Sequence, residues 1–227
     1  SAGYDIIRKL GHHIEAPVPS LFTFNIPDKE LHQLAGVSVG SADVKISGTK
    51  LNYVGPLLIT HWGLSGPAVL KLSAFGARVL AEKQYLYEVR VNWISTYTAD
   101  TVKIALGDVI NEHGKKLLLN AIPFELPKRL WDYILFRAEI PGDRRWLDLG
   151  TKQLNKLSEM LCNCTFQAKG KTTYKDEFVT CGGVSLKEIN FDSMESRICK
   201  GLYFAGEVMD VDGITGGFNF QNAWTTG

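Results

Sequence analysis

The stretch Gly201-Leu-Tyr-Phe-Ala-Gly-Glu-Val-Met-Asp-Val-Asp-Gly-Ile-Thr-Gly-Gly-Phe-Asn-Phe-Gln-Asn-Ala-Trp224 decides the predicted fold. Its apolar residues 202–205 have the length of a short buried strand, and Gly206 ends that run. A loop follows that carries three acidic residues, Glu207, Asp210 and Asp212. Three glycines then make the backbone permissive, Gly213, Gly216 and Gly217. The apolar pattern after them favours a helix that begins near Phe218.

A strand, an acidic glycine loop and a helix N-terminus together suit a polyhydroxylated, anionic ligand. Carboxylates accept hydrogen bonds from sugar-like hydroxyl groups. The free amides of a first helical turn carry partial positive charge and favour a phosphate or an electron-rich ring oxygen. Such loops also occur without any ligand, so this chemistry predicts a site only together with the order of the residues.

The order of residues from 202 to 224 resembles the closing flavin-binding motif of the aminoacetone-oxidase-like NAD(P)/FAD-dependent oxidoreductases, a family of predicted bacterial flavoproteins. The resemblance implies FAD as cofactor, a small-molecule substrate and possible reduction by NAD(P)H. It implies that Glu207 and Asp210 contact ribityl or phosphate-linked groups and that Asn219 and Gln221 hold the turn. The implied cofactor-binding residues are Gly206, Glu207, Asp210, Gly213, Gly216, Gly217, Phe218, Asn219 and Gln221.

A second motif, Thr60-His-Trp-Gly-Leu-Ser-Gly-Pro67, has two interpretations. It lacks the Gly-x-Ser-x-Gly spacing of a hydrolase nucleophile, so a strand that turns into a helix, capped by Ser65, is the simpler one. The motif is also similar to the substrate-domain signature of the same oxidoreductases. That resemblance implies that Thr60, His61 and Trp62 line the substrate side, with His61 as the candidate catalytic residue. A packed, hydrogen-bonded His61 stays an equally good alternative.

Composition limits the classes of partner. The net charge of the 227 residues is +1, which predicts no nucleic acid and no anionic membrane as partner. No apolar run approaches the length of a membrane span, and four cysteines favour a reducing cytoplasm. The spacing in Cys162-Asn-Cys164 and the adjacent His12 and His13 predict no metal site. The oligomeric state stays open.

The predicted fold class is α+β. Alternating strands are expected at residues 21–26, 37–39, 42–46 and 85–93, with turns between them, which favours a barrel. Helical periodicity follows over 98–161, with Asp100 and Gly114 at start and stop positions of its first helix. The basic pairs Lys115-Lys116 and Arg144-Arg145 are short, so a solvated surface is the expected interpretation.

With the resemblance, these patterns predict five segments: the edge of an FAD-binding domain, the first part of a β-barrel substrate domain, a helical insert, the return strands of the barrel, and the C-terminal part of a Rossmann-type FAD-binding domain. Their expected bounds are 1–16, 17–97, 98–161, 162–183 and 184–227.

Members of the resembled family carry a dinucleotide-binding unit with a Gly-x-Gly-x-x-Gly fingerprint ahead of the part that this chain matches, and the chain has no such fingerprint. The resemblance therefore implies a fragment of a flavin-dependent oxidoreductase. By itself this fragment should be inactive and flavin-free. The alternative is a non-enzymatic β-barrel domain that binds a small ligand or a protein.

Overall fold

The computed structural model describes residues 2–170 and 179–227, and these residues form two compact units. The first, here called the terminal unit, contains Ser1–Phe22, Leu70–Tyr85 and Thr173–Gly227. The second, the barrel unit, contains Thr23–Val69 and Leu86–Thr172. The domain boundaries expected from sequence stay a prediction.

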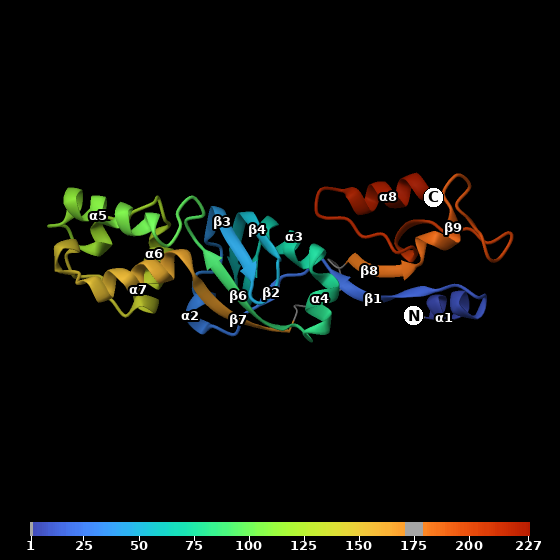
Figure 1. Cartoon of the computed structure of the whole chain (residues 1–227), viewed down its shortest axis with the longest axis horizontal. Coiled ribbons are helices and arrows are strands. Elements are labelled where there is room, and N and C mark those ends of the chain that lie inside the picture. The colour runs from blue at the N-terminus through green and yellow to red at the C-terminus, as the bar shows by residue number, and fades with distance from the viewer. Residues whose placement is uncertain (1, 171–178) are drawn as a thin grey trace. The chain divides into compact units, whose positions relative to one another are not determined.

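The barrel unit is built on one antiparallel sheet of six strands in the order β2-β5-β4-β3-β6-β7. The strands are β2 (Phe24–Asn25), β3 (Ser38–Ile46), β4 (Asn52–Thr60), β5 (Gly63–Ser65), β6 (Leu86–Asn92) and β7 (Cys164–Lys169). The first and last strands of this order also lie close to each other, so the sheet curls into a nearly closed barrel (Figure 1). The barrel part of the predicted fold is therefore confirmed.

Strand β6 shows why this sheet has an inside. Tyr87, Val89 and Val91 alternate along it and are buried, as the sequence pattern predicts. Its neighbour β3 differs from the prediction of two strands with a turn at residues 40–41. It is one strand with a register shift between Val39 and Ala42, so the predicted turn is a bulge.

The turn from β4 to β5 contains the Thr60–Pro67 motif. Gly63 has a φ of +149°, and a Cβ there would lie 2.2 Å from the carbonyl oxygen of Phe24 on β2. Only glycine allows β2 to pair so closely with β5 at this point. The Thr60 hydroxyl donates to the Gly63 carbonyl at 3.2 Å and braces the same turn.

A helical insert connects β6 to β7 within the barrel unit (Figure 1). Its elements are α5 (Thr101–His113), the 3₁₀ turn η1 (Leu118–Asn120), α6 (Lys128–Ala138), the 3₁₀ turn η2 (Trp146–Asp148) and α7 (Thr151–Cys162). Helix α5 begins after Asp100 and ends before Gly114, which confirms the predicted bounds. On α6, Leu130, Tyr133 and Ile134 are buried as expected, whereas Phe136 is exposed. A short helix α2 (Lys29–His32) precedes β3.

The terminal unit combines residues from three parts of the chain. Strand β1 (Ile14–Ser20) pairs antiparallel with β8 (Val179–Val184), and β9 (Ile189–Asn190) pairs with β10 (Glu195–Ser196). Helix α1 (Ala2–Lys9), η3 (Leu186–Glu188), η4 (Gly206–Val208), α4 (Ala77–Glu82) and α8 (Phe218–Thr226) complete the unit, and α3 (Pro67–Phe75) begins in the barrel unit and ends here. One cluster of buried residues in this unit consists of Ile14, Val184, Ile189, Phe204 and Met209.

The strand predicted over residues 202–205 is absent. Tyr203 makes a single bridge to Glu195, and Phe204 alone of these four side chains is buried. A run this short becomes a strand only with neighbouring strands to pair with, and these residues have one isolated bridge. The helix predicted after Gly217 is present as α8.

Candidate functional site

A cavity of about 510 Å³ in the terminal unit lies beside the N-terminus of α8. The end of β1, the start of β8, η4 and the loop before α8 contribute to its wall. The lining residues are Leu21, Val179, Glu207, Ile214, Thr215, Gly216, Gly217, Asn219, Phe220 and Ala223. This volume is in the range of small-molecule and cofactor sites.

Helix α8 presents an uncapped N-terminus. Its N-cap is Gly217, whose left-handed φ of 86° suits glycine, and no side chain caps the helix. The first backbone bond of the helix runs from the Gln221 amide to the Gly217 carbonyl at 2.9 Å. The amides of Phe218, Asn219 and Phe220 therefore have no helical carbonyl to pair with and carry the positive end of the helix dipole.

The Asn219 side chain fixes the loop before α8. Its Oδ1 accepts from the Gly213 amide at 2.7 Å, and its Nδ2 donates to the Gly213 carbonyl at 3.0 Å. This paired contact closes the loop that contains Gly216 and Gly217. The predicted role of Asn219 as a residue that holds the turn is consistent with this contact.

Two of the three loop carboxylates are occupied by contacts within the unit. Asp210 forms an ion pair with Arg78 at 3.1 Å, and Arg78 also donates to the Ala16 carbonyl. Asp212 accepts from the Ser20 hydroxyl at 2.9 Å. Glu207 is exposed at the cavity, so its carboxylate is the one placed to accept hydrogen bonds from the hydroxyl groups of a ligand. Burial, and then the charges of Glu207 and Asp210, raise the pKa of Tyr4.

Four predicted cofactor residues, Glu207, Gly216, Gly217 and Asn219, thus line one cavity. The others lie elsewhere in the same unit: the Gly206 amide donates to Thr226, and the Gln221 side chain donates to Thr225. Sequence reasoning did not assign Phe220 and Ala223 to the site, although their i, i+3 spacing places them on one helix face. Leu21 and Val179 left no local signal, because they meet only through the pairing of β1 with β8.

The predicted substrate-side residues lie in the barrel unit, at the turn between β4 and β5. The His61 side chain is exposed, so the alternative of a packed histidine is not what the structure shows. Its ring centroid lies 6.5 Å from that of Trp62. The role of Thr60, His61 and Trp62 toward a substrate stays a prediction.

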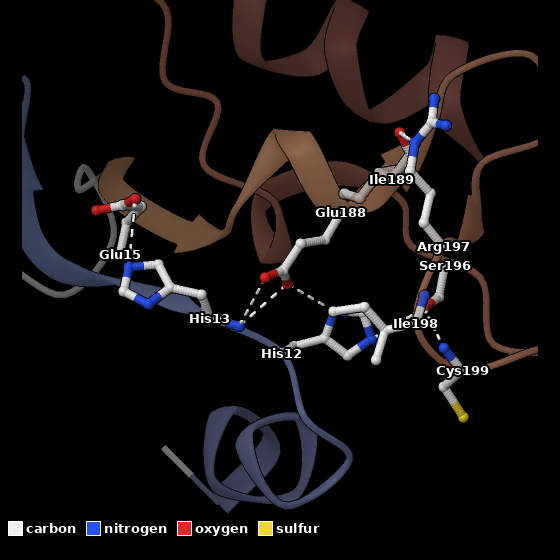
Figure 2. Close-up of polar contacts among 9 residues, drawn as sticks. All are labelled: His12, His13, Glu15, Glu188, Ile189, Ser196, Arg197, Ile198 and Cys199. Carbon is white, nitrogen blue, oxygen red and sulfur yellow. Dashed lines mark hydrogen bonds and ion pairs between the residues drawn. The ribbon is translucent and has the colours of Figure 1, made fainter.

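The side chains of the adjacent His12 and His13 point in different directions (Figure 2). The imidazole of His12 is fully buried and lies between Glu188, 2.9 Å from Nδ1, and Ser196, 3.0 Å from Nε2. The His13 ring points instead toward Glu15, at 3.4 Å. Within residues 2–170 and 179–227, no cluster of His, Cys, Asp or Glu could hold a metal ion.

Serine, histidine and carboxylate in a row invite comparison with a hydrolase triad, but the serine serves another purpose. The Ser196 hydroxyl oxygen accepts from the amides of Ile198 at 3.0 Å and Cys199 at 2.7 Å. Its proton is therefore directed to His12, whose Nδ1–H then donates to Glu188. Because Ser196 is also buried, this relay ties the segment before β1 to the loop after β10.

Comparison with known proteins gives the family. The family model described as HI0933-like protein barrel and H2TH domain matches residues 18–179, a range that contains the six-stranded sheet and the helices α5 to α7. The chain belongs to the HI0933-like family. The resemblance to aminoacetone-oxidase-like oxidoreductases was therefore the wrong family assignment.

Curated relatives extend over nearly the whole chain. It is 35% identical to the ribosomal RNA dihydrouridine synthase of Escherichia coli K12, over 99% of the chain and 54% of that protein. The protein of that name from Haemophilus influenzae is 31% identical, over 99% of the chain and 53% of its own length. The 3-dehydro-bile acid delta(4,6)-reductase of Clostridium scindens is 28% identical, over 100% of the chain and 56% of its own length. The chain spans about half the length of these relatives.

These names overturn the exclusion of nucleic acid. That exclusion came from a net charge of +1, yet two relatives are named for a reaction on ribosomal RNA. A sum over the whole chain does not register a local cluster of like charges, which is what a phosphate backbone contacts. Among the described residues, no helix combines the length and the apolar character needed to cross a bilayer.

Proposed function

We propose that the protein is part of a flavin-dependent oxidoreductase that reduces a carbon–carbon double bond next to a carbonyl, in a uridine of ribosomal RNA. The observation that carries the proposal is the 510 Å³ cavity at the uncapped N-terminus of α8. The relatives' names support the enzyme over a non-enzymatic binding barrel. An RNA substrate also favours the expected cytoplasmic location.

The names of the relatives share one kind of chemistry. Dihydrouridine is uridine in which the ring double bond conjugated to a carbonyl is saturated, and a delta(4,6)-reductase likewise acts on carbon–carbon double bonds. In such a reduction a hydride adds to the carbon remote from the carbonyl and a proton adds to the adjacent carbon. A bound flavin supplies the hydride, and NAD(P)H is the proposed electron donor.

The residues at the cavity fit a flavin. In this proposal, the free amides of Phe218, Asn219 and Phe220 would hold the ring end of the flavin and would stabilise negative charge on it. Glu207 would accept hydrogen bonds from hydroxyl groups of the ribityl chain. Asp210 would stay paired with Arg78 and would shape the loop. His61 is the proposed proton donor on the substrate side, with Thr60 and Trp62 beside it in the β4–β5 turn.

Residues 1–227 by themselves should hold flavin weakly. Two or three hydrogen bonds, each worth about 1 kcal/mol net, do not offset the cost of immobilising a cofactor as large as FAD. We therefore propose that residues 184–227 are the C-terminal part of a Rossmann-type FAD-binding domain and that residues 1–16 form its edge. The remaining contacts would come from the part of the relatives' length that this chain does not span.

The proposal is tested on the protein purified in its full natural length. Replacing Asn219→Ala removes both bonds to Gly213, so flavin content, read from the visible absorbance of the released cofactor, should fall at least tenfold. Asn222→Ala, on the same helix and away from the cavity, is the matched control and should keep its flavin. Equal flavin content in both variants would contradict the proposed cofactor site.

The substrate part has a separate readout. The wild-type protein, incubated with NADPH or NADH and bacterial ribosomal RNA, should produce dihydrouridine detectable by mass spectrometry of the digested RNA. His61→Gln should slow this production while leaving flavin content unchanged. If the protein carries flavin but forms no dihydrouridine, the RNA substrate is ruled out and the proposed cofactor site is not.

A further inference from the structure

Two basic dipeptides that are far apart in sequence lie side by side in the helical insert. Lys115-Lys116 follows α5, and Arg144-Arg145 precedes η2. An antiparallel bridge joins Leu117 to Arg145, and the Leu118 amide donates to the Arg144 carbonyl at 2.9 Å. The Trp146 amide donates in turn to the Lys116 carbonyl at 3.2 Å. We call residues 114–118 and 142–146 together the basic loop pair.

Buried aromatic side chains hold the basic loop pair in place. Trp146 is fully buried and stacks on Trp131 of α6, with ring centroids 5.8 Å apart and planes 22° apart. Trp131 Nε1 donates to the Leu118 carbonyl at 2.9 Å, and Trp146 Nε1 donates to the Ala121 carbonyl at 3.1 Å. The backbone that carries the four cations is therefore fixed before any ligand binds, which lowers the entropy cost of binding.

The four cations are available to a partner. Lys115, Lys116 and Arg145 are exposed and Arg144 is half-buried, and none of them has an ion pair within the described part of the chain. By contrast, Arg78, Arg90 and Arg137 all pair with carboxylates.

Two acidic residues lie within or beside the basic loop pair. Asp143 is exposed, and Asp148 accepts from the Arg145 amide at 3.4 Å. A local excess of two positive charges remains.

We propose that the basic loop pair binds the phosphate backbone of structured RNA and so orients it for the reaction of the barrel and cofactor. This inference rests on the proposed function for the identity of the nucleic acid. It also gives the basic pairs a role, in place of the solvated surface expected from sequence. Because the whole chain has a net charge of only +1, the cluster is a local feature rather than part of a generally basic surface.

The test compares two variants with the same loss of charge. In the first, Lys115, Lys116, Arg144 and Arg145 are all replaced by Gln. In the control, four exposed lysines elsewhere are replaced by Gln: Lys50, Lys103, Lys187 and Lys200. Binding of transcribed ribosomal RNA is measured by filter retention at a series of KCl concentrations, with circular dichroism to verify folding.

The loop variant should bind at least tenfold more weakly than wild type. Its slope of log K against log[KCl] should be shallower by about 3, since each lost phosphate contact removes about 0.7 to 0.9. The control should change binding less than threefold. A third variant, Arg144→Lys with Arg145→Lys, keeps the charges and should keep the wild-type slope. A loop variant with the slope and affinity of the control would overturn the inference.

Flavin content separates this failure from failure of the proposed function. The loop variant should retain the flavin of the wild-type protein, because the loop pair belongs to the barrel unit and the cavity to the terminal unit. If the wild-type protein carries flavin and the loop variant binds RNA as tightly as wild type, the inference about the basic loop pair is refuted and the proposed function is not. A flavin-free wild type refutes the proposed function and leaves the binding comparison intact.

Discussion

Single residues such as His12 show what local sequence can and cannot predict. The side chains of the adjacent His12 and His13 point apart, as expected of neighbouring residues. Nothing in the sequence linked His12 to Glu188 and Ser196, which lie more than 170 residues away. Such a contact arises only when β1 and β8 pair, so it is a product of the fold rather than of any motif.

Glu88 gives a prediction about pH. The Ser47 hydroxyl donates to it at 2.6 Å and Arg90 at 3.0 Å, and these bonds lower the pKa of Glu88. Because the folded pKa lies below the unfolded one, the stabilisation is present above the unfolded pKa and is lost as pH falls through the folded pKa.

Ser47→Ala should therefore lower the free energy of unfolding by about 0.5–1 kcal/mol at neutral pH, and by less at about pH 3. Urea unfolding of both proteins at the two pH values measures this difference. A difference that stays constant with pH would contradict the assignment to the Glu88 carboxylate.

At the scale of elements, sequence periodicity predicted the strands and helices that bury one face. Strand β6 and helix α5 follow their patterns, since Tyr87, Val89 and Val102 are buried at the expected spacing. The bulge in β3 was missed because Gly40-Ser41 also reads as a turn, and only its two partner strands distinguish the cases. The strand expected at 202–205 failed because its pairing depends on residues outside the segment.

Asp28 joins two elements and predicts their coupling. Its Oδ1 caps α2 by accepting from the Leu31 amide at 2.8 Å, and its Oδ2 accepts from the buried Tyr133 hydroxyl on α6 at 2.8 Å. Asp28→Ala should lower the free energy of unfolding by about 2–3 kcal/mol, because it removes the helix cap of α2 and one hydrogen bond of the Tyr133 hydroxyl.

A double-mutant cycle with Tyr133→Phe, measured by urea unfolding, separates the two contributions. Tyr133→Phe keeps the cap but removes the hydroxyl contact. The double variant should therefore lose at least about 0.5 kcal/mol less free energy of unfolding than the sum of the two single variants. Strict additivity would show that the hydroxyl contact contributes nothing.

At the scale of the whole molecule, the candidate site was predicted in outline. Glycines and acidic residues in the loop before α8 pointed to it, and four of the nine expected cofactor residues, Glu207, Gly216, Gly217 and Asn219, line the cavity. The apolar wall from Leu21 and Val179 could not be predicted, because three separated parts of the chain build the terminal unit. The basic loop pair was missed for the same reason, since Leu117 and Arg145 are 28 positions apart in the sequence.

The two compact units should unfold separately on heating. Calorimetry should resolve two transitions, and His12→Ala should lower only one of them, by on the order of 10 °C, because it leaves Glu188 and Ser196 unsatisfied in a small unit. Asp28→Ala should lower only the other. A single transition moved by both variants would show that the units unfold as one.

The pairing of β1 with β8 has a consequence for how this architecture can change. Ser20 lies opposite Val179, so the chain departs from one sheet and returns to it at adjacent rungs. The family match over residues 18–179 begins and ends at these same strands. Within this segment residues 70–85 belong to the terminal unit, and Arg78 pairs there with Asp210, whereas Thr23–Val69 and Leu86–Thr172 form the barrel unit. Sequence change confined to the barrel unit therefore leaves the pairing of β1 with β8 and the Arg78 contact in place, so the substrate side can diversify while the terminal unit keeps its structure.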